Sequence, residues 1–146
     1  MDTAALPYLQ PVPISSAPVW LQAARVSVAA GFPSPAEDHQ VERIELVSQL
    51  VRHPQATFCV RIQGDSMRDV GILDGSVVIV DRAIDAQHGH IVVAVFDNEL
   101  TCKRLYQIGN QMRLKSENPA YKDIVPKDGQ TIQLWGVVVA TIHQFI

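Results

Sequence analysis

The chain has 146 residues, a length that suits one domain with a short appendage. Hydrophobic residues make up 47% and charged residues 18%, so the composition is that of a globular protein and excludes a wholly disordered chain. The net charge of −3 argues against a protein that grips nucleic acid through a basic face, although contact with DNA through a partner protein is compatible with it.

No targeting or membrane segment is expected. The first basic residue is Arg25, so no positively charged region precedes an apolar stretch. Proline and glutamine break the apolar stretches, and none approaches the ~20 residues that a membrane span needs. Cys59 and Cys102 lie in apolar, strand-like runs without metal-ligand spacing, which favours buried or half-buried thiols in a reducing compartment. We therefore expect a cytoplasmic protein.

Residues 1–30 differ from the rest of the chain. They have no sustained helical or strand period, and prolines recur at Pro7, Pro11, Pro13 and Pro18. Because proline opposes helix and is excluded from central strands, this stretch is predicted to be an extended arm. Its apolar residues, such as Leu9 and Trp20, are more than a solvated tail would carry, so we expect the arm to lie on a folded surface of this chain or of a partner.

A helix is predicted next. Ser34 suits the N-cap, Pro35 the first helical position and Glu37 the third residue of a capping box. Apolar residues between Val41 and Val51 then cover a broad arc, which predicts a helix that is mostly buried. His53 precedes a proline and ends the predicted helix.

From residue 57 onward the pattern is that of β-structure. Segments rich in valine, isoleucine and threonine, bounded by turn residues, read as strands: 57–62, 76–81, 90–96, 99–106, 111–115 and 131–142. Asp97-Asn98 is a plausible two-residue hairpin loop, and Gly109-Asn110 is another turn. Short connections imply antiparallel neighbours. The predicted fold class is mainly β, with one short N-terminal helix against a twisted, mostly antiparallel sheet.

A candidate nucleophile lies between two of these strands. Gly64-Asp65-Ser66-Met67 follows a predicted strand directly and precedes a turn-rich stretch. A serine at such a junction can expose its hydroxyl, and neighbouring backbone N–H groups can face a developing oxyanion. So short a motif is also common in ordinary turns, and a nucleophilic serine needs a base.

Lys103 is the candidate base. In a strand, Lys103 shares a face with Thr101 and Leu105, while Cys102 and Arg104 take the other face. If one sheet face is covered, one of the two adjacent cations must point inward. Burial lowers a lysine pKa from ~10.4, and a neutral amine can then take a serine proton, which a guanidinium cannot. Alternatively, both are solvated cations on an edge strand.

Histidine is the rival base, and the chain has five: His39, His53, His88, His90 and His143. The spacing of His88-Gly89-His90 also raises the question of a metal site. No nearby carboxylate or thiolate completes a ligand set there, and a turn entering the next strand explains the segment more simply. We therefore predict no metal and no cofactor.

Ordered motifs from residue 31 to the end together resemble one family. They are GFPSPA (31–36), HPQAT (53–57), GDSM (64–67), GI (71–72), DG (74–75), VIVD (78–81), HGHIV (88–92) and WGVV (135–138). In this order they are similar to the UmuD-type proteins of the LexA/UmuD self-cleaving serine–lysine peptidases. That resemblance implies the family's twisted, mostly β domain, which dimerises.

The resemblance also assigns roles to residues. It makes Ser66 the nucleophile, Lys103 the general base and Ala30–Gly31 the scissile bond, with the Met67 amide as an oxyanion donor. Residues 1–30 would then be a cleavable arm and residues 31–146 the peptidase domain. Small residues at the bond fit this assignment, since the serine must approach the carbonyl group closely.

The family's biology follows as a further implication. Cleavage would be stimulated by a RecA filament on single-stranded DNA in the SOS response, and the trimmed homodimer would assist a Y-family error-prone polymerase of the UmuC type in translesion synthesis. A non-cleaving dimeric interaction module is the alternative. A LexA-like transcriptional regulator would need a helix-turn-helix, which thirty proline-interrupted residues cannot supply, so direct sequence-specific DNA binding is not expected. A signal peptidase shares the serine–lysine chemistry but would need a membrane anchor, and no membrane segment is expected in this chain.

Overall fold

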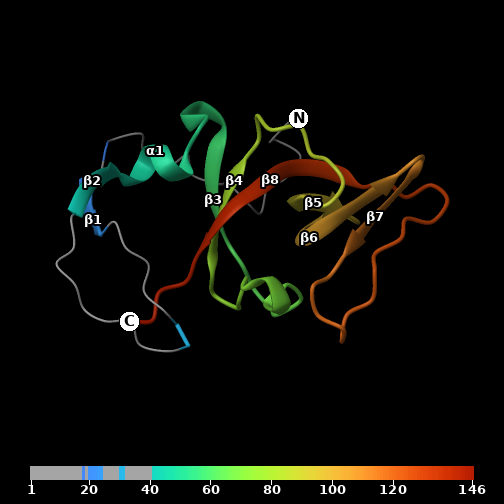
Figure 1. Ribbon diagram of the computed structural model, residues 1–146. Coiled ribbons are helices and arrows are strands. Elements are labelled where there is room, and N and C mark those ends of the chain that lie inside the picture. The colour runs from blue at the N-terminus through green and yellow to red at the C-terminus, as the bar shows by residue number, and fades with distance from the viewer. Residues whose placement is uncertain (1–17, 19, 25–29, 32–40) are drawn as a thin grey trace.

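The computed structural model describes residues 18, 20–24, 30–31 and 41–146 (Figure 1). The elements in chain order are β1 (Trp20–Ala24), β2 (Val41–Glu45), α1 (Leu46–Leu50), β3 (Thr57–Arg61), β4 (Val77–Asp81), β5 (Ile91–Phe96), β6 (Glu99–Ile108), β7 (Gln111–Lys115) and β8 (Gln133–Ile142). Short 3-10 turns, η2 and η3, cover Pro54–Ala56 and Arg68–Val70. The mainly β fold predicted from the sequence is confirmed.

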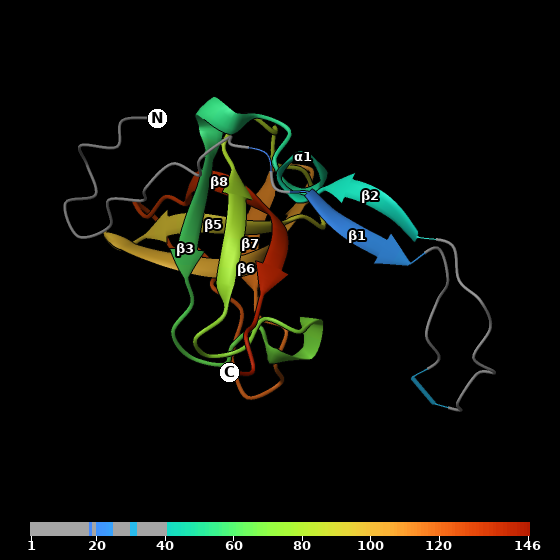
Figure 2. The same cartoon turned by 90° about the vertical axis from the view of Figure 1, so that its left-hand side faces the viewer.

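The main sheet has six strands in the order β3-β4-β8-β5-β6-β7, and every neighbouring pair is antiparallel. Its register shifts between Ile79 and Val80 on β4 and between Val93 and Ala94 on β5, where β8 pairs with each strand. Such irregularities bend a strand and increase its twist. Figure 2 shows the result, with β3 and β4 crossing the β5–β6 pair and the long β8 strand joining the two halves.

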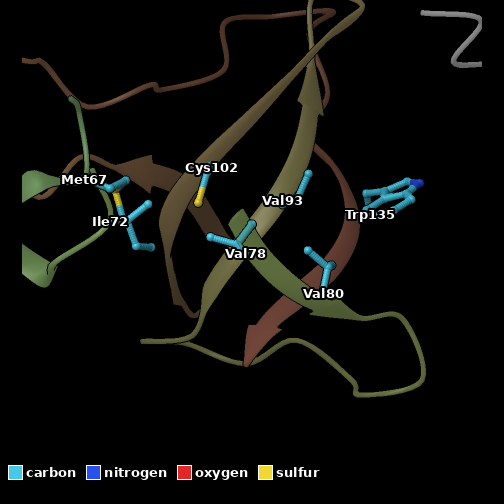
Figure 3. Packing of buried hydrophobic residues seen from close by; sticks show 7 residues of the cluster. All are labelled: Met67, Ile72, Val78, Val80, Val93, Cys102 and Trp135. Carbon is cyan, nitrogen blue, oxygen red and sulfur yellow. The ribbon is translucent and has the colours of Figure 1, made fainter. Parts of the chain in front are cut away.

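The core consists of two buried clusters. One buried cluster contains Met67, Ile72, Val78, Val80, Val93, Cys102 and Trp135 (Figure 3). A second contains Val92, Ala94, Leu105, Leu114 and Val137. Met67 comes from the turn that carries Ser66 and is only 1% exposed. Since burying such a side chain stabilises by about 1.5–3 kcal/mol, Met67 anchors that turn to the sheet.

The predicted hairpins are confirmed. Asp97 and Asn98 connect β5 to β6 with positive φ angles of 50° and 62°, the geometry of a primed two-residue turn. Asparagine and aspartate tolerate this left-handed region better than other residues with a Cβ. Gly109 has φ 61° at the β6–β7 turn.

Of the cysteines, Cys102 is buried as expected, whereas Cys59 is exposed on the edge strand β3, so the expectation of burial is wrong there.

The predicted helix is largely wrong. Residues Val41–Glu45 form β2 and pair antiparallel with β1, and α1 takes only Leu46–Leu50. No residue of α1 is buried, so the predicted burial is wrong as well. The Glu45 carboxylate caps the helix by accepting from the Val47 and Ser48 amides at 2.9 and 2.6 Å. Pairing with a distant strand has overridden the helical spacing of the apolar residues. The predicted capping box at 34–37 lies outside the described residues.

The described part of the arm includes one strand. Residues 20–24 form β1, whose only paired neighbour among the described strands is β2 in a separate two-stranded sheet. Trp20 is 55% exposed, and the Arg43 guanidinium lies 5.4 Å from its ring centroid. Figure 2 shows this β1–β2 ribbon projecting from the main sheet. None of the helices in the described ranges has the length and apolar character to cross a membrane.

Candidate active site

Ser66 lies in a turn, residues 64–67, that leaves β3 and leads into η3; we call it the Ser66 turn. Gly64 has φ +92°, which a residue with a Cβ would adopt only under strain, and its amide donates to Asp74 Oδ1 at 2.8 Å. The Arg68 amide donates to Asp65 O at 3.2 Å. Ser66 is half-buried and Met67 is fully buried. The hydrogen bonds of Gly64 and Arg68 therefore hold the two ends of the turn, and the buried Met67 side chain holds it against the core.

Lys103 reaches the same place from β6. Its Nζ donates to Ser66 Oγ at 2.8 Å, to Thr101 Oγ1 at 3.0 Å and to the Cys102 carbonyl at 3.1 Å. The residue is 8% exposed, so the prediction that one of the adjacent cations points inward is confirmed, and it is Lys103 rather than Arg104. The three acceptors surround the amine and fix its direction. Ser66 and Lys103, chosen from the sequence, are thus in direct contact.

The environment of Lys103 favours the neutral amine. Burial lowers the Lys103 pKa below its ordinary value, and the neighbouring Cys102 thiol opposes this only in part, because burial raises the pKa of that thiol to about 11. Among the described residues no carboxylate lies within ion-pair distance of Nζ to hold the proton on it. A neutral amine has two hydrogens for Thr101 and Cys102, which leaves its lone pair for the Ser66 hydroxyl.

Replacing Thr101 by valine is expected to lower the Lys103 pKa further. The threonine hydroxyl accepts a hydrogen bond from Nζ, and an acceptor stabilises the charged ammonium more than the neutral amine. Titration of the lysine ¹³Cε resonances by NMR measures the shift. Thr131→Val, in an exposed loop, is the control and should leave the titration unchanged. A Lys103 pKa that stays constant or rises in Thr101→Val contradicts this account.

A segment that the sequence analysis missed holds the Ser66 turn in place. The Glu117 amide donates to the Ser66 carbonyl at 2.9 Å, and the amide of the buried Asn118 side chain donates to the Asp65 carbonyl at 2.9 Å. The Tyr121 hydroxyl lies 2.6 Å from Asp65 Oδ1. Asparagine before proline at 118–119 signals a turn, but nothing local in the sequence indicates that this turn contacts residues some fifty positions earlier.

The Ser66–Lys103 pair opens into a cleft of about 290 Å³. Its walls come from the end of β3 and the start of β6, and include Val60, Ile62, Leu100 and Thr101. Met67 lines the cleft, and no hydrogen bond among the described residues uses its amide as donor. The cleft therefore combines a hydroxyl, an amine and an amide donor between walls of mixed polar and apolar residues, a set that can carry out acyl transfer.

Ala30 and Gly31 are not in this cleft. Both residues are exposed, and neither lines the space around Ser66. In the views of Figures 1 and 2 the short blue 30–31 segment lies away from the green segment that carries Ser66 and η3. The structure therefore brings together Ser66, Met67 and Lys103, and leaves the Ala30–Gly31 bond apart from them.

The described histidines have partners other than Ser66. His53 Nδ1 lies 2.6 Å from the buried Asp81 carboxylate, and His143 Nδ1 lies 3.2 Å from Ser76 Oγ. His90 Nδ1 accepts from the Gln87 amide in its own turn, and His88 Nδ1 accepts from the Gln107 amide on β6, each at 3.1 Å. His39 lies outside the described residues. In the part of the chain that the structure describes, no group of three or more potential metal ligands gathers.

The chain is similar to known proteins of one family. The family model of the peptidase S24-like proteins matches residues 18–139. The protein MucA of Salmonella typhimurium is 39% identical over 131 residues, which cover 88% of this chain and 86% of MucA. The protein SamA of Salmonella typhimurium strain LT2 is 44% identical over 115 residues, 79% of each chain.

A LexA repressor is also similar. The repressor of Polaromonas naphthalenivorans is 38% identical over 116 residues, which cover 80% of this chain and 49% of the repressor. The similarity to MucA and SamA covers most of the length of those two proteins, whereas the similarity to the LexA repressor covers about half of the repressor. The chain therefore belongs to the peptidase S24-like family, as a UmuD-type member of its LexA/UmuD group.

Proposed function

We propose that this chain is a self-cleaving serine peptidase that cuts its own Ala30–Gly31 bond, with Ser66 as the nucleophile and Lys103 as the general base. One observation carries the proposal: a buried lysine amine lies 2.8 Å from a serine hydroxyl, with a lowered pKa and no carboxylate partner among the described residues. A serine hydroxyl is a weak nucleophile until a base takes its proton, and this amine is placed to do so.

The first step forms an acyl-enzyme. The Ser66 proton moves to the Nζ lone pair while Oγ bonds to the Ala30 carbonyl carbon, and the carbonyl electrons move onto oxygen. The Met67 amide donates to that oxyanion. As the tetrahedral intermediate collapses, the carbon–nitrogen bond breaks and the Gly31 nitrogen takes the proton from the Lys103 ammonium. The product is an ester between Ala30 and Ser66, with residues 31–146 as the leaving amine.

The second step hydrolyses this ester. Lys103, neutral again, takes a proton from water, whose oxygen attacks the Ala30 carbonyl carbon. Ser66 leaves and regains its proton, and the fragment 1–30 departs with a new carboxylate. Thr101 and the Cys102 carbonyl hold Nζ in one direction through both steps, because they accept from it whether it is neutral or charged.

The substrate bond is exposed and outside the cleft, so it must move into the cleft, from the same chain or from a second copy. A tethered substrate gives the serine a high effective concentration of one bond, so slow, single-turnover cleavage is expected. A stimulating partner would act by favouring the docked state. We propose that this partner is a RecA filament on single-stranded DNA.

The biological role is proposed from the family. Relatives of the UmuD type, such as MucA and SamA, support a place in SOS mutagenesis. In this role the trimmed cytoplasmic homodimer serves as accessory subunit of a Y-family translesion polymerase of the UmuC type. The exposed 30–31 bond favours a second candidate, a dimeric interaction module that acts without cleavage. A LexA-like regulator is a weaker candidate, since the match covers 49% of that repressor.

Intact mass separates these candidates. The purified chain, incubated at pH 7 and near pH 10, should yield fragments 1–30 and 31–146, faster at the higher pH because Lys103 then loses its proton. Ser66→Ala should stay intact under both conditions. A parent chain that stays intact at both pH values, and also with RecA, ATP and single-stranded DNA, would leave the interaction module as the better account.

A further inference from the structure

Arg104 and Glu117 form an ion pair behind the Ser66 turn. Arg104 follows Lys103 on β6; its Nε donates to Glu117 Oε1 and its Nη1 donates to the Gly89 carbonyl at 2.6 Å. The side chains are 34% and 29% exposed. An ion pair at this exposure contributes little to stability through its charges alone, because water screens them. Its significance lies in what the Glu117 backbone contacts.

The Glu117 backbone is bonded twice to the segment around Ser66. Its amide donates to the Ser66 carbonyl at 2.9 Å, and its carbonyl accepts from the Asp69 amide at 2.9 Å. The first bond orients the peptide group that follows Ser66, and the second ties Asp69, in η3, to the same residue, so Glu117 restrains the backbone on which the Ser66 side chain stands. Glu117 lies beyond the end of β7, so no strand pairing within the sheet holds it there.

The register explains how the ion pair reaches this backbone. Arg104 is opposite Lys115 in the β6–β7 ladder, and Glu117 lies two residues after Lys115. Since alternate residues share a face of the sheet, Glu117 and Arg104 lie on the same face. The Arg104 guanidinium draws the chain after β7 against β6. Lys103 is the adjacent residue on β6, with its Cα about 3.8 Å away. Strand β6 thus positions the Lys103 amine directly, and it positions Ser66 indirectly, through the contact between Arg104 and Glu117.

We propose that Arg104 and Glu117 are positioning residues that hold Ser66 Oγ within hydrogen-bond distance of Lys103 Nζ. The inference rests on the proposed self-cleavage, since only there does this distance set a rate. The positioning role requires arginine in particular, because the planar guanidinium donates to Glu117 from Nε and to the Gly89 carbonyl from Nη1 at the same time. A lysine ammonium is a point donor without that fork, so it does not replace the arginine.

The test is the rate of self-cleavage of the full chain between pH 7 and 11. Arg104→Gln, Arg104→Lys and Glu117→Gln should lower the limiting rate at high pH by about 10- to 100-fold, the scale expected for a misplaced nucleophile. The pH at half-maximal rate should not rise, because Thr101 and the Cys102 carbonyl still accept from Nζ and only Ser66 Oγ, its third acceptor, moves away. A variant that was merely less stable would not show this combination at a temperature where it stays folded.

Asp123→Asn is the matched control. Asp123 pairs with Arg113 on β7 at 4.0 Å, with side chains 34% and 35% exposed, and in the described part of the chain it makes no hydrogen bond to the Ser66 turn. It should keep the parental rate. Limiting rates at the parental level in the Arg104 and Glu117 variants, or a pH midpoint that rises, overturn the proposal. So does an equal loss in Asp123→Asn.

A second measurement is independent of cleavage. In the uncleavable Ser66→Ala chain, hydrogen exchange of the Glu117 and Asp69 amides reports the two backbone bonds directly. Glu117→Gln and Arg104→Gln should speed exchange at both amides, and Asp123→Asn should not. If the parent chain never cleaves, the proposed function fails and exchange alone decides. Exchange as slow as in the control overturns the positioning role.

Discussion

Replacing Lys103 by methionine is expected to lower the rate of self-cleavage by about 10²- to 10⁴-fold, the usual contribution of a general base. Methionine fills a similar volume but has no amine for the Ser66 proton. In the parent chain the rate should rise with pH and level off once the amine is neutral. Because burial lowers the Lys103 pKa, half of the limiting rate should be reached below the ~10.4 of an ordinary lysine.

The measurement is the first-order rate of appearance of fragment 31–146 from pH 7 to 11. Lys103→Arg is the paired variant: it keeps the cation, yet a guanidinium does not release its proton in this range, so it should be as slow as Lys103→Met. A Lys103→Met chain that retains the parental rise with pH would assign the base to another group.

Replacing Met67 by alanine is expected to destabilise the domain by about 2–5 kcal/mol, the range for truncating a buried methionine. Met67 is 1% exposed and belongs to the cluster around Val78 and Trp135, so the truncation leaves a cavity under the Ser66 turn. The loss should extend to chemistry. At a temperature where the variant stays folded, cleavage should slow by about 10-fold or more, because the turn loses its anchor.

Urea unfolding in a Ser66→Ala background measures the stability, since self-cleavage then cannot interfere. Met67→Leu is the control: it conserves volume, and should cost less than about 1.5 kcal/mol and keep most of the rate. Equal midpoints for Met67→Ala and Met67→Leu would show that the side chain is not the anchor inferred from its burial.

The main sheet was predictable because its signals are local. Short turns such as Asp97-Asn98 join neighbouring strands, so β-propensity and turn chemistry suffice to place the strands and make most pairs antiparallel. The β1–β2 ribbon was not predictable in this way. Val41 and Ile44 fit a helical period as well as a strand, and only pairing with residues 20–24 decides between them.

The candidate site divides along the same line. The place of Ser66 after a strand made it a candidate, and strand alternation indicated that one of Lys103 and Arg104 points inward. The resemblance to the UmuD-type proteins selected Ser66 and Lys103, which the structure places in contact. The support from Glu117 and Asn118 did not follow, because these contacts join segments about fifty residues apart and leave no local pattern. The position of the Ala30–Gly31 bond outside the cleft depends on tertiary structure as well.

The β1–β2 ribbon has a consequence for reversibility. Before the proposed cut, β1 and β2 belong to one chain, so their five-residue pairing is an intramolecular equilibrium. After the cut, β1 belongs to a free peptide, and the same pairing becomes a concentration-dependent association. A lone two-stranded ribbon is marginal in water, so the peptide diffuses away at cellular dilution. Hydrolysis of this single bond is then effectively irreversible, because the reverse reaction needs the released peptide 1–30, which has diffused away. The edge of β2 that paired with β1 is left unpaired.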